Sequence, residues 1–419
     1  MTLFFVILIL FLMLLGTPLF AIISGITLFL LFSVEIDSSA IIIEMYRIAA
    51  TPILVAIPLF TFAGYLLSES GAPRRVVRLS DAILGWLPGG LSIISLVSCA
   101  VFTALTGATG LTIIALGGIL LPAMRQGSYP EKFSLGLLTT SGTLGLLFPP
   151  SLPLIIYAIV AKVEVNKLFV GGILPGILLV IFLSFFCVRK AIVQKVPRKE
   201  FHLTEVFLAL RAMIWELPLP IVVLGGIYTG YIAVSEAAAL TAVYVLFVEL
   251  VIYRDIKWKE LPAIMRKSML LVGGILIILG AALGLTNYLI DEQVPMRVLD
   301  LIKDQIASPT LFLIVLNLFL LAVGCIMGTL SALIVIVPLV APIAQAYGID
   351  PVHIGIIVLT NLEIGASIPP LGVNLFISSL RFERNILSLY LASLPFIVVL
   401  LLALGVITYV PWLSLALLR

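Results

Sequence analysis

The stretch TTSGTLGLLFPPSLPLIIY, residues 139–157, places two glycines, three prolines and several hydroxyls inside a long apolar segment. A helix that crosses lipid loses backbone hydrogen bonds at a proline, and nothing in the hydrocarbon replaces them. The stretch TNLEIGASIPPLGVNLFIS, residues 360–378, has the same character. The sequence therefore predicts two membrane helices that break within the bilayer.

The composition identifies the bilayer as the solvent of this chain. The 419 residues are 62% hydrophobic and 11% charged, whereas soluble domains carry about 25% charged residues. Apolar runs long enough to cross a membrane recur from end to end. The three cysteines lie in apolar segments without paired spacing, which favours packing over a redox or metal site. We expect an all-α polytopic membrane protein whose apolar start is a retained first helix.

Hydropathy predicts nine full spans and two regions that do not fit a single span. The full spans are expected near 3–33, 50–70, 133–160, 168–188, 212–227, 233–252, 268–287, 354–380 and 387–410. The regions 87–124 and 310–345 are too long for one span and have glycine-rich centres, LTGATG and CIMGTLS. Two half-length helical limbs that meet at a polar tip fit each region, because a re-entrant hairpin is tolerated where protein or water surrounds its tip.

The positive-inside rule gives an orientation. With the N-terminus in the cytoplasm and both hairpins returning to the side they enter from, most of the 24 lysines and arginines are cytoplasmic. The C-terminus is then periplasmic.

An internal repeat is visible when the chain is shifted by 220 residues. Pro149 and Pro150 then meet Pro369 and Pro370, and further matches pair glycines, threonines and prolines: Gly145 with Gly365, Thr140 with Thr360, Thr109 with Thr329, Pro122 with Pro342, and Pro175 with Pro395. Matching helix breakers at one offset are harder to obtain by chance than matching leucines. In the predicted topology the two copies face opposite ways.

Inverted repeats with discontinuous helices are typical of secondary transporters, which bind their cargo near the midplane where the repeats meet. A broken helix exposes carbonyls and amides that can hold an ion or an anionic group. The nearby hydroxyls and the Asn361 amide add oxygen ligands suited to Na⁺. A kinked packing helix would explain one break, but it explains two matched breaks poorly.

The same residues resemble a known family. VFTALTGATGLTIIALGGILLPAM, TSGTLGLLFPPSLPLIIY, GGIYTGYIAVSEAAALTAVY and IGASIPPLGVNLF are similar to the large membrane subunit of tripartite ATP-independent periplasmic (TRAP) transporters. The resemblance covers almost the whole chain. It implies an elevator-type Na⁺/organic-anion symporter in the bacterial inner membrane. It also implies two partners: a periplasmic substrate-binding protein and a small four-helix membrane subunit. Na⁺ would be the coupling ion, no organic cofactor is expected, and no nucleic acid would bind.

The resemblance also implies the positions of two Na⁺ sites and a substrate site. One Na⁺ site would lie between the first hairpin tip and the first break, at Thr106, Gly107, Ala108, Thr109, Ser141, Gly142, Thr143 and Gly145. Its twin would lie between the second tip and the second break, at Gly328, Thr329, Ser331, Asn361, Glu363 and Gly365. Substrate, a carboxylate such as a C4-dicarboxylate or a sugar acid, would lie near Pro150, Ser151, Pro370 and Asn374. Ala108 departs from the family pattern, because a serine is usual there.

Charged residues within predicted spans are functional candidates, since a charge at the membrane centre costs about 2.5–3.5 kcal/mol. Glu363 either adds charge to a cation site, takes part in proton coupling or lines a solvated vestibule. Glu236 is expected to cap a helix or to contact the small subunit. His202 and His353 are expected in solvated loops.

The repeats suggest a division of the chain. Residues 1–72 would be N-terminal scaffold helices, 73–190 the first repeat, 191–290 cytoplasmic loops and central scaffold spans, and 291–419 the second repeat. A symporter of similar architecture that works without a binding protein is the main alternative. An intramembrane enzyme is disfavoured, because the chain has neither HExxH nor Gly-x-Gly-Asp and no acidic or Ser/His pair at its breaks. A structural scaffold would have no reason for paired inverted breaks, and a channel would be distinguished by passive flux without dependence on a coupling ion.

Overall fold

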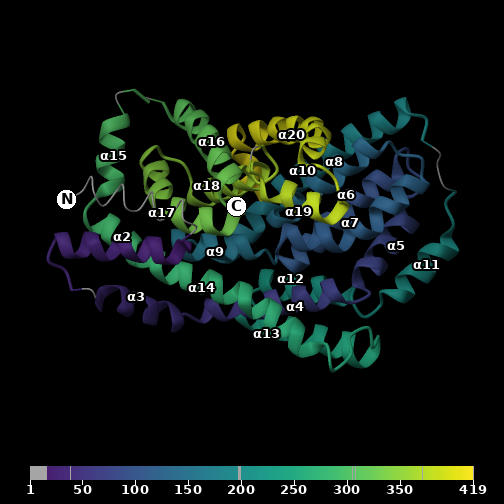
Figure 1. The fold of residues 1–419 in the computed structure, drawn as a ribbon, viewed down its shortest axis with the longest axis horizontal. Helices are drawn as coiled ribbons and strands as arrows, with labels where there is room; N and C mark the ends of the chain where they lie inside the picture. The colour runs from purple at the N-terminus through teal and green to yellow at the C-terminus, as the bar shows by residue number, and fades with distance from the viewer. Residues whose placement is uncertain are drawn as a thin grey trace.

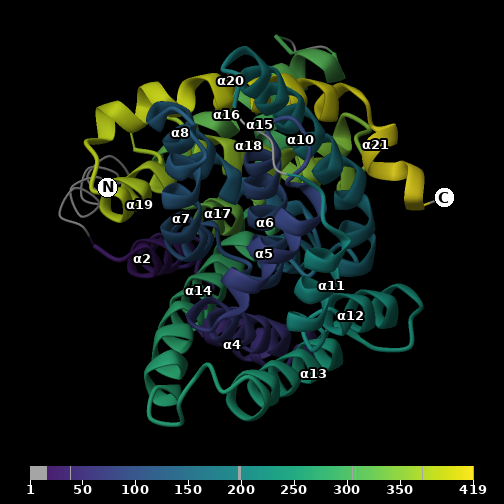
Figure 2. The ribbon, with the colours of Figure 1, turned by 90° about the vertical axis from the view of Figure 1, so that its right-hand side faces the viewer.

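The computed structural model describes residues 17–37, 39–196, 200–303, 305–306, 308–369 and 371–418, and these form helices without any strand. The helices lie in two layers (Figure 1). The lower layer in both views contains α4, α13 and α14, and the upper layer contains α16, α18 and α20 (Figures 1 and 2).

The lower layer is built from the helices outside the two repeats. They are α2 (Leu19–Ser33), α3 (Ser39–Ala49), η1 (Pro52–Val55), α4 (Ala56–Glu69), α11 (Leu203–Ala212), α12 (Pro218–Tyr228), α13 (Val234–Phe247), which continues into the π-helical turn η3 (Val248–Ile252), and α14 (Leu261–Asp291). The 31-residue α14 packs along α2, α3 and α4, and α13 packs on α4. We call this layer the scaffold.

The upper layer contains the same series of elements twice. The first is α5 (Ala72–Leu84), α6 (Gly90–Thr106), α7 (Thr109–Gln126), α8 (Glu131–Ser141), η2 (Gly142–Leu147), α9 (Leu152–Ala161) and α10 (Val165–Val193). The second is α15 (Val294–Ile302), α16 (Pro309–Ile326), α17 (Thr329–Ala346), α18 (Pro351–Gly365), α19 (Val373–Phe382) and α20 (Ile386–Tyr409), after which come α21 (Trp412–Leu415) and η4 (Ala416–Leu418). Each series is an arm, a hairpin, a broken helix and a span, as the sequence repeat predicts.

Both predicted breaks are present. In the first repeat, α8 tightens into the 3₁₀ helix η2, the chain is extended at Phe148, and α9 leaves at an angle of 48°. In the second repeat, α18 ends at Gly365 and α19 begins at Val373.

The two hairpins are also present, but their limbs are longer than predicted. Each limb has 17 or 18 residues, so at 1.5 Å per residue it is about 26 Å long. That is most of a hydrocarbon core of about 30 Å rather than half of it. The limbs lengthen because helix continues up to the tip residues themselves, with only Gly107 and Ala108, or Met327 and Gly328, between them.

The two repeats run in opposite directions. Helix α10, about 43 Å long at 1.5 Å per residue, connects the two ends of the molecule. Its last turns contact Gly89 at the base of the first hairpin. Near its other end, Tyr157 of α9 donates a hydrogen bond to the Pro351 carbonyl, just past the base of the second hairpin (2.9 Å). The hairpins therefore enter from opposite ends, which confirms the predicted inversion.

Equivalent elements of the repeats exchange contacts. Helix α7 packs on α19, and α17 packs on α9. In each pair, the second limb of one hairpin packs against the helix that follows the break of the other repeat. Reciprocal contacts of this kind are what a two-fold axis produces.

Six of the nine predicted full spans are confirmed: 50–70, 133–160, 168–188, 233–252, 268–287 and 387–410. Among the described residues, eight helices are long and apolar enough to cross a membrane, and three of these are the hairpin limbs α7, α16 and α17. The bent pair Glu131–Leu147 and Leu152–Ala161 is a ninth candidate.

The predicted first span, 3–33, lies partly outside the described residues, and the region 354–380 is the broken pair α18 and α19, each too short to be a span by itself. The predicted span at 212–227 is instead the 11-residue α12. Residues 213–217 form turns before it, and these turns bring Glu216 to Arg75.

Arg75 fixes the first arm, α5, to the scaffold. Its guanidinium bonds Glu216 (2.7 Å), Asp255 (2.5 Å) and Glu249 (3.1 Å), and it covers the ring of Tyr253. Burial alone would lower the pKa of Arg75, but the bonds and charges of these carboxylates raise it. The arm is therefore held by an arginine that stays charged.

Two glycines of the repeats allow each broken helix to approach its own hairpin. A Cβ on Gly145 would lie 2.4 Å from the Ala100 carbonyl oxygen, and one on Gly365 would lie 2.8 Å from the Cα of Gly324. Both contacts are with backbone, which cannot move aside cheaply. These glycines, predicted to let the backbone approach an ion, therefore also have a packing role.

We predict that Gly145→Ala destabilises the protein by about 1–3 kcal/mol through overpacking. The control is Gly405→Ala in α20, where a Cβ meets no atom within 4 Å. Because alanine is the better helix former by about 0.5–1 kcal/mol, Gly405→Ala is expected to be neutral or stabilising. Thermal unfolding of the detergent-solubilised variants measures both, and equal shifts would contradict the packing role.

Candidate functional site

Both hairpin tips line one cavity of about 280 Å³. Residues from both repeats and one scaffold residue surround it: Gly107, Ala108, Thr109, Gly110, Leu146, Pro153, Leu271, Gly328, Thr329, Leu330, Ser331, Glu363, Ala366, Val373, Asn374 and Ile377. We call this the central cavity.

The central cavity lies on the two-fold axis of the repeats. Five pairs of its lining residues are 220 positions apart and therefore equivalent: Ala108 with Gly328, Thr109 with Thr329, Gly110 with Leu330, Leu146 with Ala366, and Pro153 with Val373. Only residues around an axis between the repeats can line one cavity as equivalent pairs. Inverted-repeat transporters bind their cargo where the two repeats meet, and the repeats meet here.

The first tip is a tight turn closed by hydrogen bonds. Gly107 has a φ of +69°, which glycine adopts readily, and its N–H donates to the Thr103 carbonyl (2.7 Å). Beneath the tip, the hydroxyls of Thr103 and Thr112 bond each other across the two limbs (2.6 Å). The tip is therefore held rigidly, with the uncapped start of α7 beside it.

The first tip and the first break meet as predicted. A Cβ on Gly142 would lie 3.2 Å from the Thr109 carbonyl oxygen, and one on Gly107 would lie 3.0 Å from the Cβ of Leu152. The hydroxyl of Thr143 donates to the Thr140 carbonyl (2.8 Å). A hydroxyl that donates to a carbonyl keeps its lone pairs for a cation.

The second tip meets the second break in the same way. Cys325, just before the tip, donates its thiol hydrogen to the Ile368 carbonyl (3.3 Å). Asn374 lies on the cavity wall, and its side-chain amide donates to the hydroxyl of Ser367 (3.2 Å). Gly328 at the tip has open space where a side chain would be.

Several buried oxygens at the breaks have no hydrogen-bond partner among the described residues. They are Asn361 Oδ1, Glu363 Oε2 and Ser151 Oγ. Leaving a buried acceptor unsatisfied costs about 1–3 kcal/mol. Asn361 and Glu363 are both predicted Na⁺ ligands, so the orphaned oxygens fit a site that binds a cation.

Asn361 is held by a polar network that the sequence did not reveal. Its amide nitrogen donates to Asn317 Oδ1 in α16 (2.7 Å) and to the Ile357 carbonyl (2.8 Å). Asn317 in turn donates to the Thr408 hydroxyl in α20 (3.2 Å). This network fixes the orientation of Asn361 and leaves its oxygen without a donor.

Glu363 is the single charged side chain among the described residues that line the central cavity. It is 4% exposed, and on its other side it lines a small void beside Thr143 and Thr360. Thr143 is the repeat equivalent of Glu363, so the two lie together near the axis. An anion in this cavity would face a carboxylate and no basic residue, which is unfavourable unless a cation or proton accompanies it.

Eight of the predicted site residues line the central cavity: Gly107, Ala108, Thr109, Gly328, Thr329, Ser331, Glu363 and Asn374. Others are buried around it, namely Thr106, Ser141, Gly142, Thr143, Gly145, Pro150, Ser151, Asn361 and Gly365. Pro370 lies outside the described residues. The sequence analysis missed two residues that also line the cavity, Ile377 and Leu271. Ile377 could have been predicted because it lies one helical turn after Asn374, whereas nothing in the sequence indicated Leu271 of α14.

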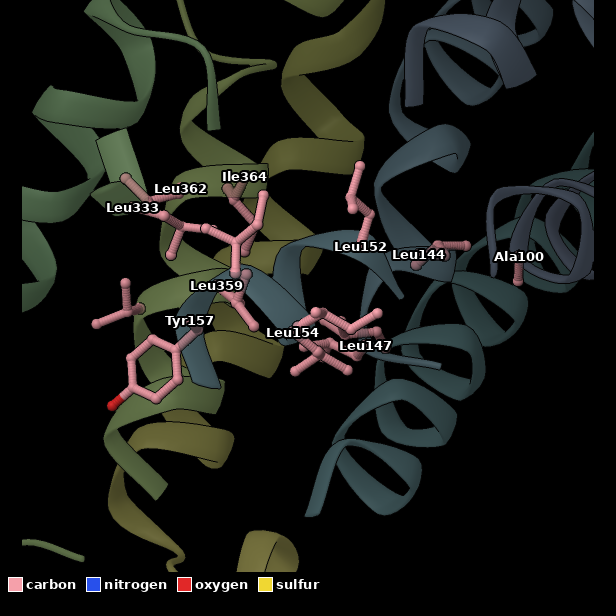
Figure 3. Close-up of a cluster of buried hydrophobic side chains, with 14 of the residues drawn as sticks. Ala100, Leu144, Leu147, Leu152, Leu154, Tyr157, Leu333, Leu359, Leu362 and Ile364 are labelled. Carbon is pink, nitrogen blue, oxygen red and sulfur yellow. The ribbon is translucent and has the colours of Figure 1, made fainter. Parts of the chain in front are cut away.

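The hydrophobic core continues directly from the breaks (Figure 3). Side chains of η2, α9 and α18 belong to one buried apolar cluster, among them Leu144, Leu147, Leu152, Leu154, Tyr157, Leu359, Leu362 and Ile364. Apolar packing therefore contributes to holding both breaks in place.

Two other sequence predictions are tested here. Glu236 caps α13, since its carboxylate accepts the Ala233 N–H (2.9 Å). The prediction for His353 was wrong, because this histidine is buried in α18. Its ring nitrogens lie 3.1 Å from Ser414 Oγ and 3.2 Å from the Thr408 carbonyl oxygen, and they join α18 to the C-terminal helices. An isolated histidine in a sequence carries no sign of such partners.

The sequence matches known proteins over nearly its whole length. The family described as "Tripartite ATP-independent periplasmic transporter, DctM component" matches residues 4–413. The C4-dicarboxylate TRAP transporter large permease protein DctM of Pseudomonas aeruginosa is 36% identical over 395 residues, which are 94% of this chain and 92% of the relative. The isethionate TRAP transporter permease protein DctMQ of Oleidesulfovibrio alaskensis is 34% identical over 364 residues, 85% of this chain and 57% of the relative.

A solved structure has a similar fold. The YdaH transporter of Alcanivorax borkumensis, whose crystal structure is described as having an unusual topology, aligns with a TM-score of 0.64 at 15% identity. The alignment covers 90% of this chain and 88% of that one. At this identity the likeness concerns the fold alone.

We predict that Asn317→Leu destabilises the protein by about 1–3 kcal/mol, because it leaves the Asn361 amide with one partner instead of two in a buried site. Ser393→Ala in α20 is the control, since its buried hydroxyl has no partner to lose. Thermal unfolding should show a clear loss for Asn317→Leu and little change for Ser393→Ala. A stable Asn317→Leu protein would show that the network does not hold Asn361.

Proposed function

This chain belongs to the family of DctM components of TRAP transporters, and from that premise we propose that it is a Na⁺-coupled importer of a small organic carboxylate. It is a large permease of this family. Permeases move solutes rather than convert them, so we expect no enzymatic activity. We place it in the bacterial inner membrane with its N-terminus in the cytoplasm and its C-terminus in the periplasm.

The single observation that carries the proposed coupling is the lining of the central cavity, which includes a buried carboxyl group and no basic side chain among the described residues. Its one charged lining residue among those described is the buried Glu363. Glu363 in its ionised form would repel a carboxylate substrate unless cations entered with it, and the orphaned oxygens of Asn361 and Glu363 are suitable ligands. Na⁺ bound at the two tip-and-break sites would then neutralise the substrate.

The two layers suggest how the substrate crosses the membrane. The hairpins and broken helices form a body around the central cavity, and this body contacts the scaffold along few helices, among them α17 on α14 and α6 on α4. We propose that it moves across the scaffold as an elevator. Gly64 of α4 supports this proposal, because a Cβ at this position would lie 2.7 Å from the Cα of Thr106. The absence of a side chain lets the scaffold helix α4 lie directly against the first hairpin.

The proposed partners follow from the family and from the relatives. We propose that a periplasmic binding protein delivers the substrate and that a small membrane subunit packs on the scaffold. The relative DctMQ is longer than this chain, which spans 57% of it, and its name joins two components. The substrates named for the relatives, C4-dicarboxylates and isethionate, are small organic anions.

Uptake by proteoliposomes tests the proposal. The chain is reconstituted with its small subunit, and succinate accumulation is measured with the binding protein, in Na⁺ or in choline, at a fixed proton gradient. We expect accumulation only when both Na⁺ and the binding protein are present. Equal uptake in choline would refute Na⁺ coupling, and equal uptake without the binding protein would favour the binding-protein-independent symporter.

We further predict that Thr329→Val raises the Na⁺ concentration for half-maximal uptake about tenfold, because a lost ligand oxygen is worth about 1–3 kcal/mol. Thr286→Val is the matched control: Thr286 is a buried threonine in α14 that bonds the carbonyl one turn back (2.8 Å) and lies away from the tips. Titration of uptake against Na⁺ distinguishes the two. If both variants behave alike, Thr329 is not a ligand.

A further inference from the structure

An apolar groove of about 330 Å³ lies between the two layers. The upper layer contributes residues of α6, α10 and the first break, and the scaffold contributes Pro220 and Leu224 of α12. The described residues that line the groove are valine, alanine, leucine, isoleucine, phenylalanine and proline without exception. An ion or a polar solute would find no side-chain partner there, so the groove suits an apolar ligand.

The groove is at mid-depth in the membrane. On α10 it is lined by Ile177, Val180 and Ile181. Ile177 comes twelve residues after the start of α10 at Val165, and Ile181 comes twelve residues before its end at Val193. Each end of α10 is therefore about 18 Å away at 1.5 Å per residue. Because the hydrocarbon core is about 30 Å thick, the groove is level with its centre.

The groove opens sideways, toward the bilayer. Val101 of α6 is 41% exposed, and Ile177 and Ile181 of α10 are 42% and 56% exposed. Between them, the small side chains of Ala100 and Ala104 line the groove and are buried. At this depth an exposed side chain meets hydrocarbon rather than water. Lipid chains are therefore the solvent that reaches the groove.

The inner end of the groove is the first break. Phe148 and Pro149 line the groove, whereas Leu146 and Pro153, which flank them in the sequence, line the central cavity. The ring of Phe148 lies directly on α10, because a Cβ on Gly176 would lie 2.8 Å from it. The break thus separates the groove from the central cavity, and an occupant of the groove would contact the back of the break.

We propose that the hydrocarbon chain of a membrane lipid occupies this groove as a removable wedge between the scaffold and the upper layer. An empty groove would leave its walls without van der Waals partners, and a chain of methylene groups fits the apolar lining. The wedge rests on the proposed function, since it affects transport only if the upper layer moves past the scaffold. The groove then has this shape in one state of the cycle, and its occupant stabilises that state.

The proposed small membrane subunit is the alternative occupant. A protein segment held in the groove would join α6 and α10 of the moving layer to α12 of the scaffold. A lipid chain can instead leave and return as the layers move. We therefore favour lipid, and the experiment includes the small subunit so that the two occupants are distinguished.

Photo-crosslinking identifies the occupant. The chain, with and without its small subunit, is reconstituted with a phosphatidylcholine that carries a diazirine at the middle of one acyl chain. It is then extracted into detergent, washed and illuminated, and mass spectrometry locates the labelled residues. We expect about fivefold more label at Ile177 and Ile181 than at Val398, an exposed residue of α20, because a lipid held between two walls dissociates more slowly. Equal labelling would overturn the proposal.

A blocking variant makes this test specific. Val101→Trp fills the groove from α6 and should remove most of the label from α10. Val398→Trp makes the same change on α20 and is the control, which should leave that label unchanged. Thermal unfolding checks that both variants fold, and Ala104→Phe is a second blocking variant. Undiminished label in a folded blocking variant would overturn the proposal. Loss of label when the small subunit is present would assign the groove to that subunit and would also overturn it.

Uptake measurements test the wedge itself. A side chain that fills the groove cannot leave it, so Val101→Trp should hold the layers in this state and lower the maximal rate of succinate uptake about fivefold. Val398→Trp should leave the rate unchanged. A normal rate in Val101→Trp would show that the groove does not act as a wedge. Crosslinking needs no transport: a labelled groove supports the lipid site even if Na⁺ dependence fails, and an unlabelled groove overturns it even if import succeeds.

Discussion

In a bilayer every backbone amide and carbonyl needs a partner within the protein. This constraint shapes the upper layer, which contains the two repeats. Each broken helix leaves such groups free, and each break is therefore surrounded by other elements of the same chain. The first break is tightened into the 3₁₀ helix η2 and pressed on α6 through Gly145. The second receives the thiol of Cys325 at the Ile368 carbonyl. The groups that remain without a partner are then the ones available to a ligand.

The inverted repeat is the simplest way to place two such breaks side by side. Helix α7 of the first repeat packs on α19 of the second, and α17 of the second packs on α9 of the first. These contacts bring both hairpin tips to one two-fold axis. Equivalent residues then surround a single cavity, as Thr109 and Thr329 do. A chain with two copies that ran in the same direction would have its hairpins entering from one side, so its breaks would not face each other at mid-depth.

Glycine and proline made this part of the fold predictable, because they act through the local backbone. The breaks and the hairpins follow from such residues at a fixed offset of 220, whereas their inversion was predicted from the topology that the basic residues indicate. The polar network of Asn317, the burial of His353 and the ion cluster of Arg75 could not be predicted in the same way. Each depends on partners from distant segments, and one residue in an apolar sequence does not indicate which partner it meets. The prediction of a full span at 212–227 was wrong for the same reason, because hydropathy does not indicate that Glu216 forms an ion pair with Arg75.

The repeats are equivalent in backbone but not in side chains, so the two repeats would contribute differently to the binding of the substrate and of the cation. Polar side chains of the second repeat line the central cavity at Ser331, Glu363 and Asn374. Their equivalents in the first repeat are Leu111, Thr143 and Leu154. The first tip also has Ala108, which offers a carbonyl but no hydroxyl. A cation at the first tip would thus have main-chain oxygens and the hydroxyls of Thr109 and Thr143 but no carboxylate. The second repeat adds the carboxyl group of Glu363 and the polar side chains of Ser331 and Asn374, which we propose to distinguish one substrate from another. Substrate preference within one fold could then change through a few positions of the second repeat, while the main-chain geometry proposed to bind the coupling ion is kept.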